Sequence, residues 1–143
     1  MAADRTASAT WHGNLTEGSG TIHSFGSGAL GDLPVTWAAR SQESNGQTSP
    51  EELIAAAHAS CYSMAFANML FKEGFTAEQL DTTAVVTFVP GTGITTSKLT
   101  VRGRVPGATA EQFLATAENA RANCPVSQAL AGVEITLDAT FEQ

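Results

Sequence analysis

Polar and apolar residues alternate along three stretches in the second half of the chain. Residues 81–89 and 94–105 flank the turn-forming run Pro90-Gly91-Thr92-Gly93, and this arrangement predicts a β-hairpin. Residues 133–141 place Val, Ile and Leu at every second position between charged and polar residues, which predicts one further half-buried strand. The second half of the chain is therefore expected to be rich in β-structure.

Shorter strand signals occupy the N-terminal region. Residues 6–11 and 20–25 predict two short strands, with glycine-containing turns between them. Residues 35–39 predict a third strand, which ends near Arg40 and is followed by a wholly polar loop. These three strands precede a marked change in the pattern.

The change is a strong helix signal. Ser49 is expected to cap the helix, Pro50 occupies its first position and Glu52 completes a capping box. Ala-rich sequence follows through Phe71, and Gly74 provides a stop. The segment has almost no polar face, and a helix that is apolar all round has to be covered all round. One small sheet covers one side, so we expect a second subunit to cover the other and the protein to be an obligate dimer.

The remaining elements complete an α+β order. Residues 109–122 predict an amphipathic helix with Phe113 and Leu114 on its apolar side, and a short helical turn is expected at 126–130. The resulting order βββ-α-ββ-α-β predicts one α+β domain over residues 1–143, with a mainly antiparallel sheet.

The composition narrows the class of protein. Of 143 residues, 43% are hydrophobic and 15% charged, as in a globular chain. The net charge is −7 and the Lys and Arg residues are scattered, so binding to nucleic acid or to an anionic membrane surface is not expected. The N-terminus has no apolar signal-peptide stretch, and the longest apolar region contains Glu, His, Ser and Asn. We therefore expect no membrane span and a soluble cytoplasmic protein.

The two cysteines lie far apart and match neither a C-x-x-C motif nor a metal cluster. Cys61 lies in the middle of the apolar helix and is either a small buried hydrophobe or a reactive thiol. Cys124 precedes Pro125 and is placed to cap the following turn, where the helix dipole and free N–H groups favour a thiolate. A cap without a redox role is the alternative for Cys124.

Three other residues are candidates for a site. Glu51 is not needed for the capping box, although an acid in the first turn also complements the helix dipole. Arg40 is either solvated or holds a carboxylate or thiolate by charge-assisted hydrogen bonds. His58 lies one turn before Cys61 and is either the base for that thiol or a packed or interface histidine.

Two runs carry a recognisable resemblance. SPEELIAAAHASC, which ends at Cys61, and CPVSQAL, which begins at Cys124, are similar to the two cysteine motifs of the OsmC/Ohr family of hydroperoxide reductases. Further matches lie at residues 10–13, 74–76, 81–84 and 134–138, so the resemblance covers essentially the whole chain. The CPVS motif resembles the OsmC branch, as does the position of Arg40 near the third strand; the Ohr branch has its arginine in the N-terminal hairpin, where this chain has Glu17.

The resemblance implies an OsmC-like fold, with antiparallel sheets around a long central helix, in an intertwined homodimer whose active sites lie at the interface. It implies stress-defence reduction of organic hydroperoxides, and of hydrogen peroxide more weakly, without metal, haem or flavin. Cys61 matches the peroxidatic cysteine and Cys124 the resolving cysteine, while Glu51 and Arg40 match the family's acid and arginine. The reductant would be an external dithiol, of lipoyl or other small type.

Helix geometry adds a constraint on this site. Glu51 precedes Cys61 by ten residues, which is about 15 Å along a continuous helix and about 80° around it. The carboxylate cannot reach that thiol within one helix, so we expect at least one of Glu51 and Arg40 to come from the other subunit.

An apolar pocket around the cysteines, including Met64, Phe66 and partner residues, would favour alkyl hydroperoxides. Two rival functions stay open at this point. One is a dimeric stress-related binding protein with incidental cysteines. The other is a hydrolase or thiol-dependent binder in which His58 is the base for Cys61.

Overall fold

The computed structural model describes residues 1–143, and the contacts within the chain divide it into two compact units, residues 1–50 and 51–143. Each unit contains its own three-stranded sheet. The structure is therefore mixed α and β, as predicted. The assignment of the whole chain to one domain stays a prediction.

The first unit holds a small antiparallel sheet in the order β1-β2-β3. Its strands are β1 (Ser8–His12), β2 (Ser19–His23) and β3 (Leu33–Val35). Thr10 pairs with Thr21 across the first hairpin, and Thr21 pairs with Pro34 on the other side. Proline lacks a backbone N–H, and the edge position of β3 tolerates that loss.

The predicted third strand over residues 35–39 is wrong beyond its first residue, Val35. The strand ends at Val35, and the chain turns into the short helix α1 (Trp37–Ser41). Thr36 causes the change, because its side chain accepts a hydrogen bond of 3.2 Å from the backbone N–H of Ala39 and so caps the helix. Arg40 therefore lies in the last turn of a helix rather than at the end of a strand.

The second unit begins with most of the long helix. Its elements are α2 (Pro50–Lys72), β4 (Gln79–Val89), β5 (Gly93–Arg104), α3 (Ala110–Asn123), α4 (Pro125–Ala129) and β6 (Glu134–Glu142). The helix α2 ends just before Gly74, whose positive φ of 94° suits glycine and stops the helix as expected.

The sheet of the second unit has the order β4-β5-β6 and is mixed rather than antiparallel throughout. The predicted hairpin of β4 and β5 is confirmed, with Thr83 opposite Thr100. The strand β6 instead runs parallel to β5, with Leu99 level with Leu137. The reason is the connection, because α3 and α4 carry the chain back along the sheet before β6 begins, as a parallel pair requires.

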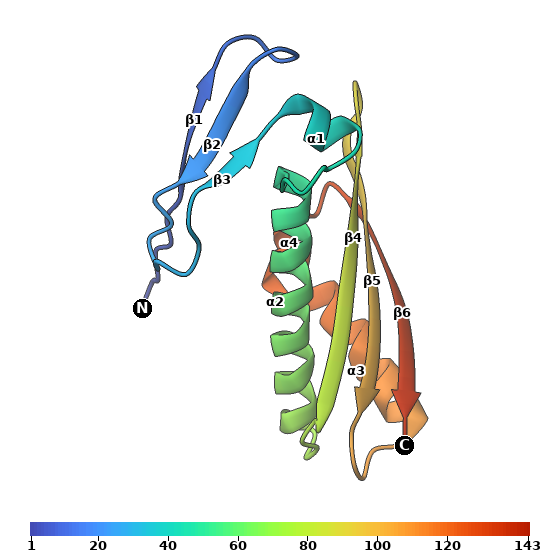
Figure 1. The fold of residues 1–143 in the computed structure, drawn as a ribbon. Helices are drawn as coiled ribbons and strands as arrows, with labels where there is room; N and C mark the ends of the chain where they lie inside the picture. The colour runs from blue at the N-terminus through green and yellow to red at the C-terminus, as the bar shows by residue number, and fades with distance from the viewer. The chain divides into compact units, whose positions relative to one another are not determined.

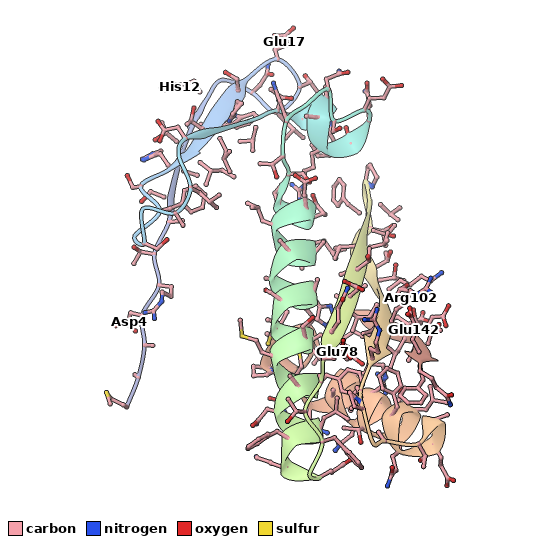
Figure 2. All side chains as sticks on the ribbon, turned by 60° about the horizontal axis from the view of Figure 1, so that its bottom comes forward. Asp4, His12, Glu17, Glu78, Arg102 and Glu142 are labelled. Carbon is pink, nitrogen blue, oxygen red and sulfur yellow. The ribbon has the colours of Figure 1, made fainter.

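Helices cover one face of this sheet, as Figure 1 shows for α2, which runs alongside the strands. Tyr62 and Phe66 of α2 pack into one core with Leu99 of β5 and Phe113 of α3. Leu114, expected beside Phe113, is instead 46% exposed. The opposite face of the sheet is polar, and on it Arg102 donates to the Glu142 carboxylate at 2.7 Å, the pair labelled in Figure 2.

The helix α2 buries a single stripe. Five of its residues are buried and recur at helical spacing, namely Glu51, His58, Tyr62, Phe66 and Leu70. Met64 and Phe71 point away from that stripe and are 72% and 69% exposed.

By length and composition alone α2 is the one helix apolar enough to cross a membrane. This is weak evidence for a membrane span, because the core helix of a soluble protein passes the same test.

Candidate active site

The structure brings the two cysteines together. Cys61 projects from the middle of α2, and Cys124 occupies the junction between α3 and α4. Their sulfur atoms lie 3.5 Å apart. Cys124 is fully buried and Cys61 is half-buried, and both are free thiols. A thiol that solvent can reach thus lies in contact with one that it cannot.

Cys124 caps the short helix α4, as predicted. Its backbone is extended, Pro125 follows at the first helical position, and its sulfur accepts a hydrogen bond of 3.3 Å from the backbone N–H of Ser127. Its own backbone N–H donates to the carbonyl of Ala120 and closes α3. One residue therefore ends one helix and starts the next, and this fixes the direction of its side chain.

The surroundings of Cys61 disfavour its thiolate within the second unit. Burial raises the pKa of the Cys61 thiol above its ordinary value, and the adjacent Cys124 raises it further. A hydrogen bond from the backbone of Val126 acts in the opposite direction. A nucleophilic Cys61 would therefore need a positive group close to the sulfur.

His58 is not the base for Cys61. Its Nδ1 lies 2.7 Å from the Ser97 hydroxyl and its Nε2 lies 2.8 Å from the Ser127 hydroxyl. Burial lowers the pKa of His58, so the ring is neutral and donates through one nitrogen while it accepts at the other. Because both ring nitrogens are hydrogen-bonded to serines, His58 cannot serve as the general base of the hydrolase alternative. It is a packed histidine, which was the other interpretation.

Glu51 lies in the first turn of α2 and is buried. The helix continues without a break from Pro50 to Lys72, so the rise of about 15 Å between Glu51 and Cys61 stands. The structure therefore does not bring the carboxylate to the thiol of the same chain.

Arg40 lines a pocket of about 360 Å³ that belongs entirely to the first unit. Apolar side chains form most of the remaining wall, chiefly Trp11, Leu15, Val35 and Trp37. The guanidinium group gives this pocket a fixed positive charge among aromatic and aliphatic groups. Such a pocket suits a ligand with one polar and one apolar part.

The expected lining of the pocket needs correction. Phe66 is fully buried, with its ring packed between those of Tyr62 and Phe113 at centroid distances of 5.7 and 5.1 Å. It therefore belongs to the core of the second unit. The residues that do surround Arg40 include both tryptophans of the chain, and an apolar side chain with a polar tip is common at binding sites.

Glu17 lies in the connection between β1 and β2, where Figure 2 labels it. Its backbone N–H donates to the side-chain oxygen of Asn14 at 2.8 Å, which closes the turn.

No group of three or more His, Cys, Asp and Glu side chains in the chain could hold a metal ion.

Comparison with known proteins identifies the family. The model of the OsmC-like protein family matches residues 43–138. The chain belongs to the OsmC family. It is 43% identical over 141 residues to two proteins named peroxiredoxin OsmC, from Escherichia coli strain K12 and from Shigella flexneri, with 96% of each chain covered. The expectation of a cysteine-based peroxidase is thereby confirmed at the level of enzyme class.

Solved structures support the same fold at lower identity. An OsmC-like protein from Mycoplasma pneumoniae matches with a TM-score of 0.73 at 16% identity, and both chains are covered completely. An organic hydroperoxide resistance protein from Elizabethkingia anophelis matches with a TM-score of 0.68 at 23% identity over 99% of this chain and 100% of its own. OsmC membership thus rests on sequence and on fold together.

The sequence reasoning missed Ser97 and Ser127 as partners of His58. Ser97 occupies an inward-facing position on β5, in register with the buried Leu99 and Val101. A serine in such a row signals a buried polar partner, because an unpaired hydroxyl there would be costly. The alternation of residues 97–101 indicates that Ser97 faces inward, but it does not indicate which side chain Ser97 contacts.

Proposed function

We propose that the protein reduces organic hydroperoxides, and hydrogen peroxide more weakly, with Cys61 as the attacking and Cys124 as the resolving thiol. The observation that carries the proposal is the distance of 3.5 Å between the two sulfur atoms. Two incidental cysteines, 63 positions apart along the chain, have no reason to meet at a helix cap. A binding protein with inert thiols leaves that contact without a role.

The reaction has three balanced steps. The Cys61 thiolate attacks one peroxide oxygen, the O–O bond breaks, and the alkoxide takes a proton and leaves as the alcohol. The sulfur is oxidised to a sulfenic acid. The thiol of Cys124 then condenses with that sulfenic acid, which forms the disulfide and releases water. An external dithiol, of lipoyl or other small type, reduces the disulfide by exchange and is itself oxidised to a disulfide.

Arg40 is proposed to supply the positive charge that Cys61 needs. Since burial raises the pKa of this thiol, a guanidinium close to the sulfur would restore the thiolate and also hold the peroxide. Glu51 is proposed to orient the peroxide beside Arg40. The apolar wall of Trp11 and Trp37 in the Arg40 pocket supports a substrate with an alkyl or aryl group.

The active unit is proposed to be a homodimer. The support is the outer face of α2, where Met64 and Phe71 are exposed, although an apolar side chain gains roughly 1.5–3 kcal/mol on burial. The separation of Glu51 from Cys61 along one continuous helix is the second support, because a partner chain can bring Glu51 where its own chain cannot. We further propose that this dimer works in the cytoplasm, where dithiols are kept reduced.

Mixing the reduced protein with cumene hydroperoxide and a dithiol tests the proposal. With the dithiol present we expect catalytic loss of peroxide, faster than with hydrogen peroxide, and Cys61→Ser abolishes it. Without the dithiol, the wild type consumes one equivalent and shows a Cys61–Cys124 disulfide in the mass spectrum, whereas Cys124→Ser consumes one equivalent and stops at a Cys61 sulfenic acid that dimedone traps. A wild-type protein that consumes no peroxide, or that consumes it without this disulfide, excludes the proposed function and favours the binding protein.

A further inference from the structure

We propose that His58 is a positioning residue for the resolving thiol: it holds α4 in place, and with it the sulfur of Cys124 beside Cys61. The inference rests on the proposed function, because it assigns His58 to the second step of that reaction. His58 is fully buried, and neither of its ring nitrogens faces a cysteine. Its role has to run through the two serines that it contacts.

The three side chains join three separate elements. His58 belongs to α2, Ser97 to β5 and Ser127 to α4, and the hydroxyls lie 2.7 and 2.8 Å from the ring nitrogens. All three residues are buried. In such surroundings a hydrogen bond is well defined in direction, and the loss of one partner leaves the other group unsatisfied.

The short helix α4 depends on this contact. Its five residues form little more than one turn, which is too short to be stable by itself. Ser127 is its one buried residue. The hydrogen bond between Ser127 and His58 is therefore the principal polar anchor between α4 and the core of the second unit.

Ser127 also contacts the resolving cysteine directly. Its backbone N–H donates to the sulfur of Cys124 at 3.3 Å, while its hydroxyl meets His58. A shift of Ser127 thus displaces the cap and the sulfur together. Cys61 is held differently, because it projects from the middle of the long helix α2.

This division predicts which chemical step depends on His58. Attack on the peroxide uses Cys61, which α2 positions, and α4 contributes to that step only the backbone hydrogen bond of Val126 that lowers the pKa of the Cys61 thiol. Disulfide formation requires the sulfurs to move from 3.5 Å to about 2.05 Å, which is a small movement only if Cys124 starts from its observed place. If α4 is not anchored, Cys124 is displaced from Cys61, and the sulfenic acid should persist longer before the disulfide forms.

Single-hydroxyl deletions test the inference with little disturbance of the fold. Ser127→Ala removes the link from His58 to α4, and Ser97→Ala removes the link from His58 to the sheet. Ser63→Ala is the matched control, because the Ser63 hydroxyl donates at 2.7 Å to that of Thr82 and so also ties α2 to the same sheet, without contact to α4. Far-UV circular dichroism verifies that all three variants are folded.

The two chemical steps are then measured separately after rapid mixing with cumene hydroperoxide. Consumption of the Cys61 thiol should keep the wild-type rate in Ser97→Ala and Ser63→Ala. In Ser127→Ala it should change less than disulfide formation does, because a shift of α4 reaches Cys61 only through the Val126 hydrogen bond. Disulfide formation should slow about tenfold in Ser127→Ala and, to a lesser extent, in Ser97→Ala, which corresponds to the loss of one buried hydrogen bond. The dimedone adduct of Cys61 should rise in step, while Ser63→Ala behaves like the wild type.

Three outcomes overturn the inference. Equal rates of disulfide formation in Ser127→Ala and Ser63→Ala exclude a role for the His58 contact. An equal slowing of both steps in Ser127→Ala indicates general loosening rather than positioning of Cys124. A wild-type protein that consumes no peroxide overturns the proposed function and this inference with it, so the two failures are distinguishable.

Discussion

Tyr62 lies at the centre of the helical side of the core, one residue after Cys61. It is fully buried, and its hydroxyl donates at 2.9 Å to the carbonyl of Ala117. Burial raises the pKa of Tyr62 well above its ordinary range. The negative charge of Glu118 adds to the effect, and the positive charge of Arg121 opposes it.

The raised pKa has a measurable consequence, because Tyr62 is the only tyrosine of the chain and tyrosinate absorbance reports on it alone. The folded state binds this proton more tightly than the unfolded state. Its contribution to stability is therefore complete below about pH 10, the unperturbed value, and is lost as the pH rises above it. We expect the denatured protein to form tyrosinate near pH 10 and the native protein to form it only on unfolding. Tyrosinate that appears near pH 10 with an unchanged circular dichroism spectrum would contradict this.

At the scale of single residues, the sequence predicted local roles better than distant contacts. The cap at Cys124 was predictable because Pro125 and the N–H of Ser127 are its immediate neighbours in the chain. The partners of His58 were not, because Ser97 and Ser127 come from positions 39 and 69 residues away. Nothing in the local pattern ranks one serine above another as a partner.

At the scale of elements, α3 packs so closely on β5 that one position admits only glycine. A Cβ atom at Gly103 would lie 2.5 Å from Cε2 of Phe113 and 2.8 Å from Cδ2 of Leu80. The Phe113 ring cannot withdraw, because the rings of Phe66 and Phe141 lie on it with centroids at 5.1 Å.

We therefore expect Gly103→Ala to lower the free energy of unfolding by about 1–3 kcal/mol, through overpacking of the core. Denaturation in urea, followed by circular dichroism, measures the difference. Gly132→Ala is the control, because a Cβ at Gly132 meets no atom within 4 Å. Equal midpoints for the two variants would show that the core accommodates the methyl group.

The elements themselves were predictable where one signal dominated. The period-2 alternation of β4 and β6 and the helix start at Pro50 identified those elements. The strand prediction was wrong for residues 37–39. Val35, Thr36 and Trp37 are residue types that favour a strand, but the Thr36 hydroxyl caps a helix. The prediction of a mainly antiparallel sheet was wrong for β6, because the alternation within a strand does not show whether its neighbour runs parallel or antiparallel.

At the scale of the whole molecule, α2 presents apolar side chains on the face opposite its buried stripe. Its buried stripe faces the core, while Met64 and Phe71 on the other side remain exposed. The sequence predicted an apolar helix but could not say which residues face outward, since almost every position on the helix is apolar or small. The second subunit that would cover the exposed residues stays a prediction. Cys61 and Cys124 meet within residues 51–143, whereas Arg40 belongs to residues 1–50, and its role beside Cys61 stays a proposal.

A mixed dimer of two inactive chains tests whether Glu51 acts across subunits. One chain carries Cys61→Ser and keeps Glu51, and the other carries Glu51→Ala and keeps Cys61; two different affinity tags allow isolation of the heterodimer. Since about 15 Å of helix separates the two residues in one chain, only the partner's carboxylate can serve an intact Cys61. We expect the heterodimer to recover about half of the wild-type peroxidase rate, because one of its two sites combines both groups, while each parent homodimer stays inactive. A heterodimer as inactive as its parents would place Glu51 and Cys61 of the same chain in one site, whereas an active Glu51→Ala homodimer would remove Glu51 from the reaction.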